Sequence, residues 1–394
     1  MVAESVMATR ETPHKGAVSL ENHVVFAAAE LATLISLILR AGYELIGPTV
    51  RDGAVVYAPI QSAQDLPQGW TDEQNPASYR LKPRPDDAYF GYTLGPQSWK
   101  KYLHPSQIRL WSAERKGSSF RILNNESRPK SPLAFLGVRA CELAAIRLQD
   151  RVFLEDRYRD PVYDGHRSGA FLIAVQCTQS TATCFCSSMG TGPAVLSGAD
   201  LVLIELRDGG KHRFLARVDS ERGEKILGQL KITAAKESDL DEAEAALHGA
   251  ASVQKRAIDN TGIRELLYQY FEHPHWEAVA ARCLGCANCT LVCPTCFCTT
   301  VEDVSDVTGQ HAERWRKWDS CFTQTFSYIH GGSVRTSGKA RYRQWITHKL
   351  AAWQDQFGAS GCVGCGRCIT WCPVGIDITE EVRSLREGDK NGNS

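Results

Sequence analysis

Residues 133–153 read LAFLGVRACELAAIRLQDRVF, and the segment AFLIAV follows at residues 170–175. LAFLGV is a continuous apolar run of strand length, whereas CELAAIRLQDRVF has its apolar residues at helical spacing. AFLIAV has the composition of a second buried strand. A strand, a helix and another strand in succession predict a right-handed parallel crossover. This stretch therefore predicts an α/β domain with a mixed sheet.

The segments that follow extend the same domain. LVLIEL (201–206) and HRFLARV (212–218) are further strand candidates, and residues 219–270 are rich in charges and have a helical pattern. A domain boundary is expected near residues 272–282, where EHPHWEAVAAR leads into a cysteine-rich region. We therefore expect an α/β domain over residues 21–272 and a second domain over residues 273–394.

The N-terminal side is less regular. Residues 1–20 are expected to form a loose tail, and residues 22–42 a helix that ends at Gly42. Residues 43–130 are rich in Pro, Gly and isolated aromatics, which indicates loops and short strands without defining a topology. The first residues lack an apolar segment of the secretory type, and the most apolar stretch, residues 24–41, contains acidic, basic and hydroxyl side chains. We therefore expect a cytoplasmic protein without a membrane span.

Composition narrows the class of function. The chain has 394 residues with 43% hydrophobic and 23% charged residues, and its 45 basic residues balance 45 acidic ones. Neither nucleic acid nor a charged membrane surface is an expected partner. Fifteen cysteines are far above the usual content. Because no export signal is present, disulfides would not persist, and the cysteines are interpreted as metal ligands or buried thiols.

Two runs near the C-terminus share one cysteine spacing. CLGCANCTLVCP (283–294) and CVGCGRCITWCP (362–373) both follow C-x₂-C-x₂-C-x₃-C-P. In the bacterial arrangement of this motif, three cysteines of a run bind one four-iron, four-sulfur (4Fe-4S) cluster, and the fourth binds the neighbouring cluster. Two structural zinc sites are the alternative, but zinc sites usually pair two C-x₂-C knuckles without a third cysteine. The expected ligand sets are Cys283, Cys286, Cys289 and Cys372 for cluster 1, and Cys293, Cys362, Cys365 and Cys368 for cluster 2.

The long segment between the two runs does not fit a compact β-containing ferredoxin. ERWRKWDSCFTQTFSYIH (313–330) and RYRQWITHKLAAWQDQFG (341–358) have helical patterns. We therefore expect an α-helical ferredoxin-like domain with two 4Fe-4S clusters at the C-terminus.

Seven cysteines remain outside the eight in these runs. Cys141 and Cys177 each follow a predicted strand, so parallel pairing would bring both to the carboxyl edge of the sheet, where open α/β sheets bind ligands. Cys184 and Cys186 follow in a loop that can fold back over them. These four thiols are candidates for a third 4Fe-4S cluster, with scattered buried thiols or a zinc site as alternatives.

The last three cysteines, Cys296, Cys298 and Cys321, are too few for a four-cysteine site. They are interpreted as thiols that pack around the clusters or donate weak S–H hydrogen bonds to them, with a ligand role as the alternative.

Several catalytic signatures are absent from the sequence. It has no phosphate-binding glycine loop, no dinucleotide fingerprint, no nucleophile elbow and no H-E-x-x-H. We therefore expect no catalytic residue, flavin or nicotinamide on this chain, which would carry electrons between centres on other subunits. A cluster-containing regulator would need a DNA-binding face that is not evident, and an enzyme using a cluster as Lewis acid would need an iron without a cysteine ligand.

The chain resembles the beta (iron–sulfur) subunit of cytoplasmic NADP-linked nickel–iron sulfhydrogenases, and a related iron–sulfur subunit of anaerobic sulfite reductase. The resemblance covers roughly residues 130–380. It rests on GVRACELAAIRLQDRVFLE, CTQSTATCFCSSMGTGP, EHPHWEAVAARCLGCANCTLVCPTCFC, RKWDSC and GCVGCGRCITWCPVGI.

This resemblance implies partners. They are the small and large nickel–iron hydrogenase subunits and an FAD/NADP(H)-binding subunit, in a cytoplasmic heterotetramer. The chain would relay single electrons between the small and the flavin subunits. The sulfite reductase relatives imply an equivalent relay in a different complex, and the shared motifs leave the choice open.

Overall fold

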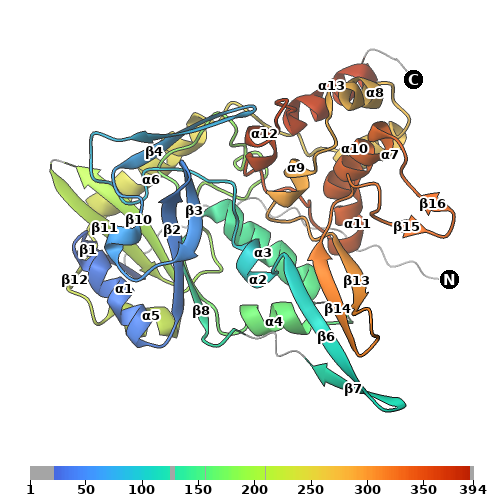
Figure 1. Ribbon diagram of the computed structural model, residues 1–394. Coiled ribbons are helices and arrows are strands. Elements are labelled where there is room, and N and C mark those ends of the chain that lie inside the picture. The colour runs from blue at the N-terminus through green and yellow to red at the C-terminus, as the bar shows by residue number, and fades with distance from the viewer. Residues whose placement is uncertain (1–21, 125–128, 156, 209, 391–394) are drawn as a thin grey trace, which may run out of the picture.

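The computed structural model describes residues 22–124, 129–155, 157–208 and 210–390, so the predicted tail over residues 1–20 lies outside the described residues (Figure 1). Its largest sheet has eight strands in the order β12-β1-β11-β10-β9-β8-β2-β3. The strands are β1 (His23–Ala27), β2 (Glu44–Arg51), β3 (Ala54–Pro59), β8 (Leu133–Val138), β9 (Phe171–Val175), β10 (Leu201–Asp208), β11 (Lys211–Val218) and β12 (Ile232–Ala234).

The centre of this sheet is parallel. Strands β8 and β9 pair in parallel and are joined through helix α3 (Ala140–Phe153), which confirms the predicted strand–helix–strand unit. Strands β2 and β10 add parallel neighbours on the two sides, and the outer pairs are antiparallel. Every residue of β8 and β9 is buried, which explains their continuous apolar sequences.

Helices cover both faces of the sheet. Phe171, Ile173 and Val175 of β9 belong to a core that includes helices α1 (Glu30–Arg40) and α5 (Glu221–Leu227). The alternate residues Leu172 and Ala174 belong to a second core with α3 and α4 (Pro161–Arg167). This two-sided burial follows from the strand period of two and leaves the carboxyl ends of the strands as the edge where ligands can bind.

The predicted helix over residues 22–42 is partly wrong. Residues His23–Ala27 form strand β1, and the helix begins only at Glu30. Strand β1 pairs with β11 on one side and with β12 on the other. Its sequence HVVFA has β-branched and aromatic residues that suit a strand, and the two partners lie far along the chain.

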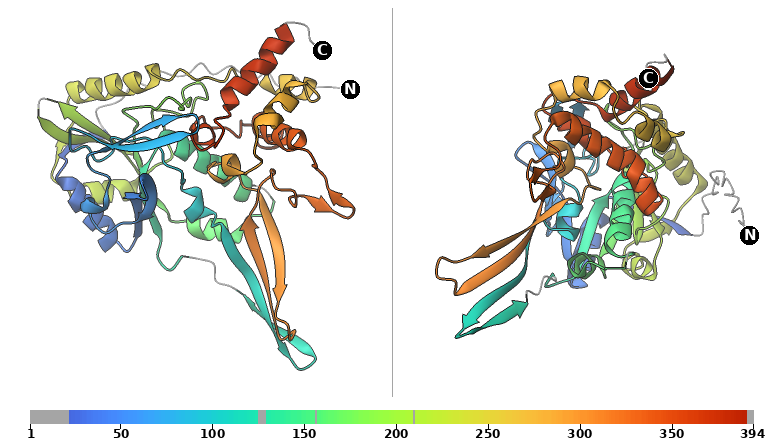
Figure 2. Two further views of the ribbon diagram at one scale, coloured as in Figure 1. Left: turned by 45° about the horizontal axis from the view of Figure 1, so that its top comes forward. Right: turned by 90° about the vertical axis from the view of Figure 1, so that its right-hand side faces the viewer.

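A second, antiparallel sheet forms an arm that extends from the body of the molecule (Figures 1 and 2). Its order is β13-β14-β6-β7, from strands β6 (Gln107–Lys116), β7 (Ser119–Asn124), β13 (Thr299–Ser305) and β14 (His311–Trp318). The start of the segment 313–330, predicted as helical, is therefore strand. Pairing with β6 overrides its helical pattern, and Arg109 on β6 contacts Glu313 at 2.6 Å. Strands from both sides of the predicted boundary thus share one sheet.

The rest of the C-terminal part is mainly helical. The predicted helix over residues 341–358 is confirmed as α10 (Gly338–Thr347) and α11 (Trp353–Phe357), joined by a π-helical turn, η3 (His348–Ala352). No helix in the described ranges is long and apolar enough to cross a membrane. The other elements are η2 (Ala63–Asp65), β4 (Trp70–Asn75), β5 (Ser78–Pro83), α2 (Lys100–Leu103), α6 (Glu237–Ser252), α7 (Ile263–Gln269), α8 (His275–Arg282), α9 (Asn288–Leu291), β15 (Tyr328–Ile329), β16 (Gly332–Ser333), α12 (Arg367–Thr370) and α13 (Ile378–Lys390).

Candidate iron–sulfur centres

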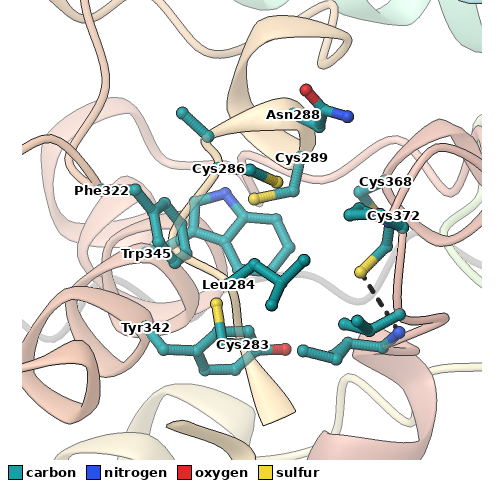
Figure 3. A pocket seen from close by; sticks show the side chains of 14 residues that line it. Cys283, Leu284, Cys286, Asn288, Cys289, Phe322, Tyr342, Trp345, Cys368 and Cys372 are labelled. Carbon is teal, nitrogen blue, oxygen red and sulfur yellow. Dashed lines mark hydrogen bonds between the residues drawn. The ribbon is translucent and has the colours of Figure 1, made fainter.

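The four ligands predicted for cluster 1 line a single cavity, together with aromatic and aliphatic side chains (Figure 3). Helix α8 ends at Cys283, the loop that follows carries Cys286, and Cys289 lies in the short helix α9. The fourth thiol, Cys372, comes from the end of the second run. The cavity is lined by Cys283, Leu284, Cys286, Ala287, Asn288, Cys289, Phe322, Tyr342, Trp345, Cys368, Cys372, Pro373, Val374 and Ile376.

Contact between the two runs brings Cys372 into this cavity. Helices α9 and α12 contact each other, so the end of the second run lies beside the loop of the first. Backbone amides face two of the sulfurs: Gly285 N donates to Cys283 Sγ at 3.4 Å, and Ile376 N donates to Cys372 Sγ at 3.3 Å. N–H groups directed at sulfur favour the thiolate form that binds metal.

The ligands predicted for cluster 2 form a second group in the interior. The thiols of Cys362, Cys365 and Cys368 each interact electrostatically with Cys293 from the first run. Burial raises the pKa of Cys362 to about 12. Cys293 differs, because the Cys296 thiol bonded to it, Lys349 and Thr295 together hold its pKa well below the usual range, against the effect of burial.

The ligands predicted for cluster 3 form a third group at the carboxyl edge of the large sheet. Cys141 follows β8 and Cys177 follows β9, as the sequence predicts. The loop after β9 returns Cys184 and Cys186 to them, so that Cys186 interacts with the other three thiols. Burial, reinforced by these neighbouring thiols, raises the pKa of Cys186 to about 12.

The loop carrying Cys184 and Cys186 packs directly on the second cysteine run. Phe185 N donates to the carbonyl of Gly364 at 2.9 Å. A Cβ atom added to Gly364 would lie 2.6 Å from the Phe185 carbonyl oxygen, and one on Gly366 would lie 2.4 Å from that of Thr183. Both glycines also have positive φ, at +62° and +75°. Only glycine allows this approach, which brings Cys365 into electrostatic contact with Cys141 and Cys186.

A buried ion pair joins the same two regions. Arg367, between Cys365 and Cys368, contacts Glu142 of α3 at 2.6 Å, and both side chains are 1% exposed. Tyr57 Oη and Trp99 Nε1 also donate to Glu142, at 2.7 and 3.0 Å. Because Glu142 follows Cys141 in the chain, this network holds the second and third groups against each other. The three groups therefore form a series, with the Cys293 group in the middle.

Comparison with known proteins gives two matches. Residues 282–376 match the family model of the 4Fe-4S dicluster domain. The chain is 33% identical over 275 residues to the sulfhydrogenase 2 subunit beta of Pyrococcus furiosus, an alignment that covers 68% of this chain and 79% of that protein. This chain belongs to the sulfhydrogenase beta-subunit family. No solved structure matches it significantly.

As a member of this family, the chain is an iron–sulfur electron-transfer subunit with a C-terminal 4Fe-4S domain. The donor sets fit such clusters, because each of the three groups consists of thiols, which are the ligands that iron–sulfur clusters use. Within the described ranges, no three or more His, Cys, Asp or Glu side chains are arranged around a point where one metal ion could bind. A four-iron cluster does not require that arrangement, since its four thiolates bind four different irons.

The three remaining cysteines of this family member lie together. Cys296, Cys298 and Cys321 line a small interior cavity with Trp345, His348, Lys349, Trp353 and Phe297. The thiol of Cys296 is bonded to that of Cys293, and Cys298 is bonded to Cys321. The predicted packing of these thiols around the clusters remains a prediction.

Sequence reasoning missed the charged residues that surround the thiols. Arg367, Glu142, Arg139 and Lys349 are all buried, and each lies within or next to a cysteine group. A signal was present, since a charge among apolar residues or inside a cysteine run needs a partner when buried. The sequence does not reveal which partner each charge has.

Proposed function

We propose that this chain relays single electrons between the small and the FAD/NADP(H)-binding subunits of a cytoplasmic nickel–iron hydrogenase heterotetramer. The series of three cysteine groups carries this proposal, because a chain of adjacent redox centres can pass electrons between partners on its two sides. Membership in the sulfhydrogenase beta-subunit family supports it. The chain has no catalytic residue of its own in this proposal, and it binds neither flavin nor nicotinamide.

Each group holds one 4Fe-4S cluster in this proposal. Buried thiols gathered in fours, amides directed at sulfur, and the contact between the groups support these assignments. When bound, the clusters supply one-electron redox chemistry at potentials set by their surroundings. The ligands are Cys283, Cys286, Cys289 and Cys372 for cluster 1, Cys293, Cys362, Cys365 and Cys368 for cluster 2, and Cys141, Cys177, Cys184 and Cys186 for cluster 3.

The chain's own residues shape how this relay opens to a partner. Cys286 is the one exposed cysteine among the fifteen, all of which are described. Leu284 beside it is 67% exposed, and Leu291 and Val374 add further exposed apolar surface around cluster 1. We therefore expect electrons to enter or leave through the Cys286 loop. The interior thiols of the Cys293 group are kept from water and serve transfer within the chain.

Purification of the native complex tests the proposal. A tagged chain isolated anaerobically from its host should copurify with nickel-containing and flavin-containing subunits. A siroheme protein in their place would assign the chain to the alternative, a relay in an anaerobic sulfite reductase. The isolated chain should bind about twelve irons, four for each cluster, and neither evolve hydrogen nor oxidise NADPH. Substantial activity of the single chain would refute the relay.

A further inference from the structure

Lys349 is a lysine buried beside the middle cysteine group. Its residue is 4% exposed, and it lies in the π-helical turn η3 between α10 and α11. Such turns interrupt the regular helix and occur frequently at functional sites. Here the turn contributes a cation to the protein interior.

The ammonium group of Lys349 contacts both cysteine runs. Nζ donates to Cys293 Sγ at 3.3 Å and to the carbonyl of Gly361, the residue before Cys362, at 3.1 Å. A third bond goes to Thr295 Oγ1 at 3.0 Å, and Thr295 itself donates to Gly361 O at 2.6 Å. This network fixes the cation at the point where the two ligand-bearing segments of the middle group meet.

The charge of Lys349 faces sulfur and is not neutralised by a carboxylate. Within the described chain, its hydrogen bonds go to sulfur, a hydroxyl and a carbonyl, and it forms no ion pair with Asp or Glu. Burial lowers the pKa of a lysine, but the thiolates of Cys293, Cys296 and Cys362 outweigh that effect and raise the pKa of Lys349 well above its usual value. Arg367 in the same region differs, because Glu142 balances its charge.

We propose that Lys349 raises the reduction potential of the cluster held by Cys293, Cys362, Cys365 and Cys368. This inference rests on the proposed function, which assigns a cluster to that group. Reduction adds a negative charge to the cluster, and a buried cation at hydrogen-bond distance from a ligand sulfur stabilises that charge in a medium of low dielectric. Lys349 is thus a positioning and tuning residue that makes the middle centre easier to reduce.

Three variants of the reconstituted full chain test the role of the charge. Lys349→Met removes charge and hydrogen bonds, Lys349→Gln keeps a donor without charge, and Lys349→Arg keeps the charge. We expect the two neutral variants to lower the equilibrium constant for reduction of the middle cluster at least tenfold, or about 59 mV for one electron. The arginine variant should change it less than about threefold. Redox titration followed by electron paramagnetic resonance measures these shifts.

Controls separate this inference from the assignment of the cluster. Lys339 lies on α10, the helix that leads into η3, and contacts Glu277 at 3.1 Å near the surface, so Lys339→Met should leave the potential unchanged. Cys362→Ser should remove the middle cluster's signal. If it removes no signal and no iron, the proposed function fails at that group, whatever Lys349 does.

The remaining outcomes also decide the proposal. An unchanged potential in both neutral variants, with the cluster retained, would refute it. Loss of the cluster from both neutral variants but not from Lys349→Arg would support it, because the charge would then be needed to hold the anionic cluster. Loss from all three variants would refute it, since Lys349 would then act by packing alone.

Discussion

The first and third cysteine groups differ in how the chain assembles them. The first takes three of its thiols from one seven-residue loop, residues 283–289, and it opens to the surface at Cys286. The third takes Cys141 and Cys177 from the ends of two strands and adds Cys184 and Cys186 from a loop that leans on another cysteine run. A local motif therefore defines the first group, whereas the sheet and a long-range contact define the third.

The buried ion pair is the most vulnerable link in the third group. Arg367→Met leaves the Glu142 carboxylate buried without its cation, and we expect a loss of about 3–5 kcal/mol in the free energy of unfolding. Chemical denaturation of the reconstituted chain measures it. Adding Glu142→Gln should recover part of the loss, because the acceptor remains while the charge is gone.

A surface pair provides the control for that prediction. Arg314 and Asp303 have side chains 42% and 60% exposed, so Arg314→Met should cost less than about 1 kcal/mol. Equal losses from the two substitutions would show that burial of the Arg367 pair does not matter.

Iron content tests whether the two groups are independent. Cys184→Ser should reduce the iron of the reconstituted chain from about twelve to about eight, and the first two clusters should keep their spectra. Cys286→Ser should affect only the first cluster. A wild-type chain that reproducibly binds about eight irons would eliminate the third cluster.

Two glycines with similar backbone angles allow a matched comparison of the runs. Gly364 has φ +62° and lies 2.7 Å from Cys186 atoms when a Cβ is added, whereas Gly285 has φ +64° and meets nothing within 4 Å. Gly285→Ala should cost about 1–2 kcal/mol for the left-handed conformation alone. Gly364→Ala should cost about 1–3 kcal/mol more for the clash, and it should loosen the third cluster. Equal destabilisation in thermal melts would contradict the close approach.

Exposure should set the order in which the clusters are lost in air. With a chelator present, about four irons should leave first, because the first group opens to solvent at Cys286. Native mass spectrometry at successive times should show a species with the other clusters intact. Simultaneous loss of all iron would mean that exposure of Cys286 does not control access.

The sequence alone determined the features that depend on near neighbours in the chain. Apolar runs of strand length marked β8 and β9, the helical pattern between them marked α3, and the cysteine spacing marked the 4Fe-4S domain. Each signal lies within about twenty residues, because local conformation and side-chain period are short-range properties.

Tertiary structure decided what depends on distant partners. Strand β14 carries a helical pattern but pairs with β6, and β1 lies within an apolar stretch that resembled one helix. Likewise, nothing local shows that Arg367 meets Glu142, or that Lys349 reaches Cys293. Burial makes the pairing of these charges necessary, but only the folded chain determines which groups meet.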